Sequence, residues 1–425
     1  MAEGVGASRT DGSHRVDVAI AGGGLVGASL ALALAPLGVR VALIEAVAPG
    51  VVAHPSFDER TTALANGSVR ILQALRAWRH MEREATPIRA IHVSDQGRFG
   101  TARIDAAEQG LEALGYVVPN RAIGAGLWEE LRSVAAVEVI APARVTGTGL
   151  GPAVRSLRVE CPDGDGALEL SARLVVAADG ARSAIREQAG IASEHWPYAQ
   201  TAIISTIATQ RFHDHVAYER FTPEGPIAVL PLADGRCGLV WTRRPEEAAR
   251  LLALPDDAFL VELQSAFGFR LGRLLQVGAR HAYELALSRS GRHVASRFAI
   301  AGNAAQGLHP IAGQGFNLGL RDAASLAEVL ADALVEGSTD VGADDALAVY
   351  AGWRDEDRTR IVAFTDGLVR LFGTPLGALR GLRSVGLLAF DAFPPAKRAM
   401  ARLSVGAAVR VPRLARGVPL EAARR

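Results

Sequence analysis

The chain has 425 residues, which is enough for two or three folding units with ample core. Its hydrophobic content of 49% argues against long disorder, and 46 basic against 45 acidic side chains argue against a nucleic-acid binder, which usually carries a basic excess. Two cysteines and ten scattered histidines without ligand spacing argue against a disulfide framework and a structural metal site, and they suit a reducing cytoplasm.

The first predicted elements form a βαβ unit, with a strand at 17–21, an alanine- and leucine-rich helix at 25–37 and a strand at 39–44. Residues 18–39 carry no charge, a length that imitates a membrane span or a signal peptide. Because three glycines at 22–24 and Pro36 interrupt this run, a buried strand, turn and helix fit it better. We therefore expect neither a membrane span nor an export signal.

Further elements are predicted along the chain, with helices at 68–78, 121–133 and 323–336 and short buried strands at 174–178 and 298–301. Residues 201–243 differ, because β-rich segments alternate there with Pro-Glu-Gly and Ala-Asp-Gly turn signals. This stretch predicts an antiparallel sheet inserted between parts of a parallel one, hence a second domain.

Three motifs carry the chemistry, and the first is Gly22-x-Gly24-x-x-Gly27 between strand and helix, with Glu45 closing the second strand. Small residues let the backbone approach a pyrophosphate, and the helix N-terminus stabilises its charge. A carboxylate at Glu45 accepts from ribose hydroxyls and disfavours a 2′-phosphate. The motif thus predicts NAD or FAD.

The second motif is a strand that ends in Asp179-Gly180, which alone is an ordinary turn. The third is the stretch 301–322, unusually dense in Gly, Pro and Asn just before a helix. Such a composition is costly for folding unless backbone must lie against a flat or anionic ligand. The only lysine, Lys397, lies in no P-loop sequence, so a P-loop nucleotide site is not expected.

In this order and spacing the motifs resemble those of the single-component flavoprotein aromatic hydroxylases. Four segments are similar to the ubiquinone-biosynthesis members: FDERTTAL at 57–64, YVVPNRAI at 116–123, GPIAVLPLADGRCGLVW at 225–241 and the stretch 302–322. The resemblance implies FAD as cofactor, NAD(P)H as transient co-substrate, and reaction of O2 at flavin C4a to a hydroperoxide that hydroxylates a polyprenylated phenol.

The implied fold class is α/β, a Rossmann-like FAD-binding domain with an inserted antiparallel-sheet substrate domain and C-terminal helices. We expect residues 1–14 to form a flexible tail. The other expected divisions are an FAD-binding domain at 15–75, 100–190 and 285–345, a substrate domain at 76–99 and 191–284, and a C-terminal helical region at 346–425.

The resemblance also implies roles for individual residues. It implies that the ADP half of FAD is bound by Gly22, Gly24, Gly27 and Glu45. It also implies that the flavin chain or pyrophosphate is contacted by Arg60, Asn120, Asp179 and Gly180. The isoalloxazine is expected to lie against Pro310, Gly313, Gln314, Gly315 and Asn317. Asn303 departs from the family pattern, in which most members carry Asp for the ribityl hydroxyls. Asn keeps one acceptor, so we expect FAD binding to survive, and the Gly-Asn form favours the 2-polyprenyl-6-methoxyphenol hydroxylase branch.

The catalytic base is less well marked. His309 is the best-placed titratable side chain by sequence, although a loop histidine bonded to backbone is an equally good interpretation. His213 and His215 alternate on an expected strand. Tyr218 and Trp241 are candidates to line a substrate pocket, but aromatic residues on a sheet more often pack in a core.

From residue 361 onward the chain has 11 basic and 3 acidic residues, a local charge of +8. This region either packs as helices on the FAD domain or contacts anionic lipid, which a prenylated substrate would favour. We expect a cytoplasmic protein, with peripheral membrane contact and other ubiquinone-biosynthesis proteins as partners held as hypotheses. Two alternative functions stay open: a flavin monooxygenase for a soluble aromatic compound, and a non-catalytic FAD-binding accessory protein.

Overall fold

The computed structural model describes residues 14–47, 60–162, 167–307, 314–373, 393, 395, 397 and 410–421, without the side chains of 314 and 361–373. An eight-stranded sheet has five parallel strands at its centre. In spatial order these are β19 (Phe298–Ile300), β11 (Ala167–Ala177), β1 (His14–Ala21), β2 (Val41–Ile44) and β8 (Val137–Ile140). At its edges lie β9 (Arg144–Leu150), β10 (Arg155–Glu160) and β18 (Val294–Ala295).

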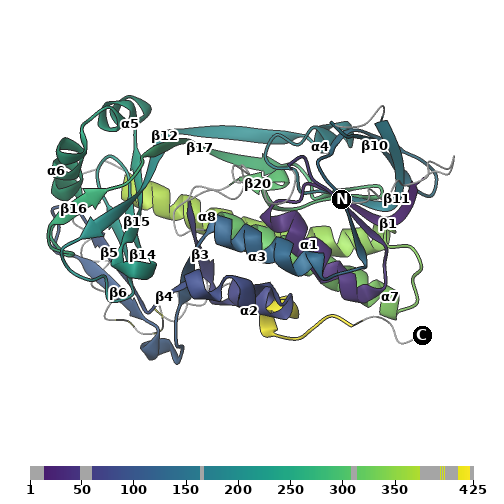
Figure 1. Cartoon of the computed structure of the whole chain (residues 1–425), viewed down its shortest axis with the longest axis horizontal. Helices are drawn as coiled ribbons and strands as arrows, with labels where there is room; N and C mark the ends of the chain where they lie inside the picture. The colour runs from purple at the N-terminus through teal and green to yellow at the C-terminus, as the bar shows by residue number, and fades with distance from the viewer. Residues whose placement is uncertain are drawn as a thin grey trace, which may run out of the picture.

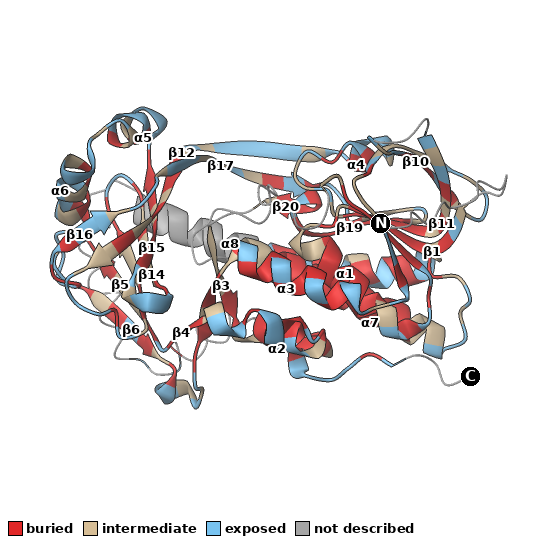
Figure 2. Cartoon of the chain, viewed as in Figure 1, coloured by how far each residue is buried: buried red, intermediate tan, exposed pale blue. Residues whose placement is uncertain are grey.

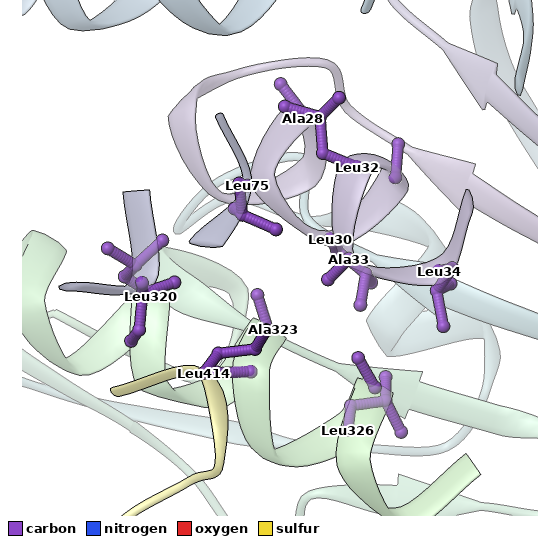
Figure 3. Packing of buried hydrophobic residues seen from close by; sticks show 14 of the residues in the cluster. Ala28, Leu30, Leu32, Ala33, Leu34, Leu75, Leu320, Ala323, Leu326 and Leu414 are labelled. Carbon is purple, nitrogen blue, oxygen red and sulfur yellow. The ribbon is translucent and has the colours of Figure 1, made fainter. Parts of the chain in front are cut away.

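The main buried core beside this first sheet includes residues of α1 (Leu25–Leu34), α2 (Asn66–Ala74), α3 (Asn120–Arg132), α7 (Gln314–Val335) and α8 (Asp344–Gly373). The alanine- and leucine-rich α1 is apolar on every side, and such a helix belongs in a core. Figure 3 shows its leucines meeting Leu320, Ala323 and Leu326 of α7, with Leu414 of the C-terminal segment beside them. The uncharged run at 18–39 is thus buried, and no helix among the described residues is long and apolar enough to cross a bilayer.

A second sheet of nine strands lies beside the first, joined to it by the long pair β12 and β17 (Figure 1). Its spatial order is β20 (Gln306–Gly307), β17 (His281–Ser290), β12 (Ser193–Thr209), β15 (Cys237–Arg243), β14 (Ile227–Pro231), β13 (Val216–Phe221), β5 (Ala90–Asp95) and β6 (Thr101–Asp105), with β16 (Leu274–Val277) against β12. Most of its pairings are antiparallel, which confirms the predicted α/β fold with an inserted antiparallel sheet.

The two faces of the second sheet have different neighbours. One face packs on α5 (Pro245–Leu252) and α6 (Asp256–Phe267) through a buried cluster that includes Trp241, Leu239 and Phe259. The other face meets a small sheet of β3 (Thr61–Ala65), β7 (Gly115–Pro119) and β4 (Thr86–Ile88). This second face therefore looks toward the first sheet and its helices.

Several details differ from the sequence-based expectations. The helix expected at 323–336 begins nine residues earlier, at Gln314, because Gly319 lets α7 approach α1: a Cβ on Gly319 would lie 2.7 Å from Val26. Strand pairing extends the second sheet to Asp105, beyond residue 99. Trp78, which falls within 76–99, packs instead in the core of the first sheet.

Candidate functional site

The carboxyl ends of the central parallel strands carry the three motifs. Ile44, Ala21, Ala177 and Ile300 are neighbours in register on β2, β1, β11 and β19. The residues that follow them therefore meet at one edge of the sheet, and these are Glu45, Gly22, Asp179 and Gly302. In open α/β sheets this edge is where ligands bind.

The first motif makes a turn that only glycine permits. Gly22 has φ +101°, and a Cβ there would lie 2.6 Å from the carbonyl oxygen of Ala178. A Cβ on Gly27 would lie 1.8 Å from the carbonyl oxygen of Gly22, so α1 passes directly against the turn. The N-cap is Gly24, and the first turn of α1 has neither a side-chain cap nor an acidic residue. Its positive end is thus available to an anionic group.

Glu45 lies beside this turn with 7% of its surface exposed. One of its oxygens accepts from the Gly23 N–H at 2.5 Å and the other from the Val47 N–H at 2.9 Å. These bonds hold the carboxylate at the carboxyl end of β2, the position that the sequence pattern predicts for a ribose contact.

The second motif follows β11. Burial raises the pKa of Asp179, and a hydrogen bond with Ser183 opposes this effect. Gly180 has φ +96° and open space at its Cβ position. The buried Arg186 donates to the carbonyl oxygens of Ala181 at 2.9 Å and Ala304 at 3.2 Å. This guanidinium therefore ties the second motif to the third.

In the third motif, Gly302 adopts φ +63° and Asn303 is exposed at the sheet edge. Within the described part of the chain the Asn303 side chain makes no hydrogen bond, which leaves its amide available to a ligand. The fully buried Asp322 on α7 holds the turn, because its Oδ2 accepts from the Gly302 N–H at 2.8 Å and from the Gln306 amide at 2.9 Å. Its Oδ1 accepts from the Arg354 guanidinium at 2.7 Å. Sequence reasoning had noted Asp322 only as the end of the motif.

Two further predicted residues lie together. The Asn120 N–H donates to the Arg60 carbonyl at 2.8 Å, and the Asn120 Oδ1 accepts from the Thr62 hydroxyl at 2.7 Å. The Arg60 guanidinium lies 4.7 Å from the ring centre of Tyr283 on β17. Arg60 therefore stands where the second sheet meets the small three-stranded sheet.

The Asn317 side chain bonds to the backbone of β3. Its Oδ1 accepts from the Ala65 N–H at 2.8 Å, and its Nδ2 donates to the Ala63 carbonyl at 2.8 Å. The amide thus fastens β3 to the first turns of α7. Gly315 in the same turns has open space around its Cβ position.

Some expected site residues cannot be placed. His309, Pro310 and Gly313 lie outside the described residues, as does the side chain of Gln314. In the ranges that are described, no three His, Cys, Asp or Glu side chains gather as metal ligands would.

The two aromatic candidates of the second sheet lie on its face toward α5 and α6. Trp241 is buried in the cluster with α6, and Tyr218 packs against the same cluster, as the core interpretation of these aromatic residues predicts. His213 precedes β13 instead of lying on it, and its ring is buried with Nε2 3.0 Å from the Leu232 carbonyl. The opposite face of β13 presents Glu219, which sequence reasoning missed.

Comparisons with known proteins agree with this geometry. A family model described as FAD binding domain matches residues 15–363. Ubiquinone hydroxylase UbiL of Rhodospirillum rubrum is 41% identical, with 95% of this chain and 93% of the relative covered. The 3-demethoxyubiquinol 3-hydroxylase of Escherichia coli is 32% identical, with 92% and 98% covered. Mitochondrial ubiquinone biosynthesis monooxygenase COQ6 of Mus musculus is 31% identical, with 90% and 89% covered.

Solved structures share the fold. The p-nitrophenol 4-monooxygenase PnpA of Pseudomonas putida superposes with a TM-score of 0.76 at 19% identity, covering 93% of this chain and 99% of the other. PqsL of Pseudomonas aeruginosa, a probable FAD-dependent monooxygenase, gives a TM-score of 0.71 at 24% identity, covering 88% and 100%.

Proposed function

The chain belongs to the FAD-dependent hydroxylases of ubiquinone biosynthesis, and from this premise we propose that it hydroxylates the aromatic ring of a polyprenylated phenol with NAD(P)H and O2. One observation carries the proposal: three motifs suited to a dinucleotide converge at the edge of the parallel sheet, beside a second sheet that faces them. Bound FAD would take up electrons from NAD(P)H and use them to activate O2.

We assign the ADP half of FAD to Gly22, Gly24, Gly27 and Glu45. The absence of room for a Cβ at Gly22 and Gly27 and the uncapped N-terminus of α1 support this assignment, because both suit a pyrophosphate. The Glu45 carboxylate, already oriented by backbone N–H groups, would accept from the adenosine ribose.

The remaining cofactor contacts are assigned as the resemblance implies them. We assign Asn303 to the ribityl hydroxyls, and Arg60, Asn120, Asp179 and Gly180 to the flavin chain and pyrophosphate. Pro310, Gly313, Gln314 and Gly315 are assigned to the isoalloxazine. For Asn317 we propose a positioning role, because its amide bonds hold β3 against α7.

The phenol would then bind between the flavin and the face of the second sheet that looks toward the first. The opposite face is closed by α5 and α6, which supports this placement. The chain's own tasks are to orient the ring, to draw off its phenolic proton and to exclude water from the activated oxygen. His309 is one candidate for this proton transfer, proposed from the sequence alone.

The proposal is tested by stopped-flow reduction of the flavin with NADPH, with and without a prenylphenol, together with product analysis. We expect faster reduction with the phenol and one oxygen atom incorporated from O2. Reduction without hydroxylated product would support an accessory role, and turnover of soluble aromatic acids alone would support the alternative substrate class. Profiling quinone intermediates in a deletion strain identifies the ring carbon, which the branch resemblance predicts to be carbon 1.

A further inference from the structure

The face of the second sheet that looks toward the first sheet carries an acid at an unusual place. Side chains alternate along a strand, and Tyr218 on β13 faces α6, so Glu219 lies on the other face. In register beside it are Ala228 on β14, then Val240 on β15 and Ile204 on β12. We call these four residues the inner row.

Two contacts place the inner row opposite the site. A Cβ on Gly238 of β15 would lie 3.1 Å from the Thr61 hydroxyl, and Tyr283 of β17 lies under the Arg60 guanidinium. Gly238 stands two residues from Val240 on one side, and Tyr283 pairs with Ala202, two residues from Ile204, on the other. The inner row therefore lies between two contacts of this sheet with the region of the site. One contact is that of Gly238 with Thr61 on β3, and the other is that of Tyr283 with Arg60, the residue before β3.

The inner row is not closed by packing among the described residues. Ile204, Ala228 and Val240 keep part of their surface exposed and belong to none of the buried clusters. One row further along, Ala217 and Leu230 pack against Val117 of β7. Small aliphatic side chains that stay accessible on an inward face suit an apolar ligand.

Glu219 stands at the end of this apolar row. Within the described part of the chain it makes neither a hydrogen bond nor an ion pair, yet burial alone raises its pKa to about 8. Glu219 keeps part of its surface accessible, although its carboxyl lies deep enough for burial to shift its pKa. An unpaired carboxyl in such surroundings costs folding free energy, which a ligand-binding role would explain.

Neighbouring charges do not account for this environment. The residues paired with Glu219 on β14 and β5 are Ala228 and Val93, which are both uncharged. Among the charged groups of these strands and of β6, Arg103, Asp105 and Arg220 lie on the other face, and Arg270 of the loop after α6 lies near His92 on that side. Asp95 of β5, which pairs with Phe221, lies on the same face as Glu219, yet burial is the only cause of the raised Glu219 pKa.

We propose that Glu219 contacts the ring hydroxyl of the phenol substrate and accepts its proton, while Ile204, Ala228 and Val240 contact the apolar part of the ring or prenyl chain. The inference rests on the proposed function. The phenolic O–H bond breaks, its electron pair stays on the phenol oxygen, and the proton moves to a Glu219 carboxylate oxygen. The added electron density prepares the ring carbon for the oxygen atom that comes from O2.

The test uses the FAD-loaded full chain and two probes, 2-geranylphenol and its methyl ether, which lacks the proton. Glu219→Gln is compared with Glu219→Asp and with Glu262→Gln, a matched control on α6 whose exposed carboxylate pairs with Arg250. We expect Glu219→Gln to lower hydroxylation by about 10²- to 10⁴-fold, with FAD content unchanged. Glu219→Asp should recover part of the rate, and Glu262→Gln should match the wild type.

Two readouts separate contact from a merely structural effect. In the wild type kcat/KM should rise with pH up to about 8 as the carboxyl ionises, and this rise should vanish in Glu219→Gln. Phenol binding, followed by the flavin absorbance change, should weaken about tenfold in Glu219→Gln, a typical loss for one hydrogen bond to a charged group, while ether binding stays constant.

The outcomes distinguish this inference from the proposed function. A Glu219→Gln variant with the wild-type rate and pH profile would overturn the role of Glu219 and leave the hydroxylase function standing. A wild type that hydroxylates no prenylphenol would overturn the function. In that case the binding measurements still decide on contact: lost discrimination between phenol and ether in the variant supports it, and unchanged discrimination refutes it.

Discussion

The Glu219 carboxyl, which has no partner among the described residues, makes the stability of the protein depend on pH. Its pKa rises from 4.5 to about 8 on folding, so the folded protein binds the proton more tightly than the unfolded chain. The cost in folding free energy of ionising this buried carboxyl is absent below about pH 4.5, grows as the pH rises and reaches its full value above about pH 8. We predict that Glu219→Gln is more stable than the wild type at pH 8.5 and equally stable near pH 4, by urea unfolding. The same difference at both pH values would contradict it.

A second residue-scale prediction concerns Gly27. An added Cβ would lie 1.8 Å from the Gly22 carbonyl oxygen, and this obstacle is backbone, which cannot rotate away. Gly27→Ala should therefore displace the turn and abolish retention of FAD during purification, measured as flavin absorbance per protein. Gly352→Ala on α8 is the control, since its Cβ position is open. There alanine should keep FAD and add about 0.5–1 kcal/mol of stability.

The residues of the candidate site differ in how well the sequence alone identifies them. Gly22, Gly27 and Glu45 were predictable because a local turn needs small residues at fixed spacing and an acid at the end of the next strand. Asp322 and Glu219 were not, because their importance comes from burial and from partners distant in the sequence, or from the lack of any. A sequence contains no direct record of either property.

At the scale of elements, the network around Asp322 joins α7 and α8 to the Gly302 turn. Asp322, Arg354 and Asp357 are all buried, with N–O distances of 2.7 Å from Arg354 to each carboxylate. Removal of one member leaves a buried charge uncompensated. Asp322→Ala should lower the free energy of unfolding by about 3–5 kcal/mol, measured by urea titration.

A control for this network lies on the same helix. Asp332 pairs with Arg413 with 45% of its side-chain surface exposed, and exposed pairs contribute about 0–1 kcal/mol. Asp332→Ala should therefore cost at most about 1 kcal/mol. If both variants lose a similar free energy of unfolding, burial of the Asp322 network does not account for its contribution to stability.

The start of α7 shows why local propensity misled the prediction. Glycine and asparagine disfavour helix interiors, so the sequence placed the helix start at 323. Asn317 gains two backbone bonds to β3, and Gly319 permits close contact with Gly302 and Val26. These tertiary contacts outweigh an intrinsic cost of about 1 kcal/mol per glycine.

At the scale of the whole molecule, non-local pairing limited the prediction. The β-rich stretch 201–243 did form strands of one sheet, as alternation and turn signals indicated. The parallel pairing of β13 with β5 joins residues over 120 positions apart, for example Val216 with Ala90. Pairing between strands so far apart in the chain depends on the assembled sheet and leaves no local pattern in the sequence. For this reason the expected substrate domain ended at residue 99, before β6, which pairs with β5.

The C-terminal region combines packing and charge. Leu414, Ala415 and Leu420 belong to the main core, and Arg413 bonds to Glu328 and Asp332 of α7 (Figure 2 shows burial along this segment). Deleting the residues from 361 onward would therefore remove core side chains together with the +8 charge. A test of lipid contact needs substitutions that change charge alone.

We propose that basic residues between 361 and 409 contact anionic lipid, and predict that substituting four of them by glutamine, Arg380, Arg383, Arg398 and Arg402, weakens binding to phosphatidylserine vesicles. Each basic residue near a membrane surface contributes about 1 kcal/mol, so the loss should approach about 10³-fold in flotation at low salt. A control variant replaces four exposed arginines elsewhere, Arg76, Arg98, Arg158 and Arg244, which conserves net charge between the variants. Equal flotation of both variants would exclude this region as the membrane contact, because net charge alone would then explain the attraction.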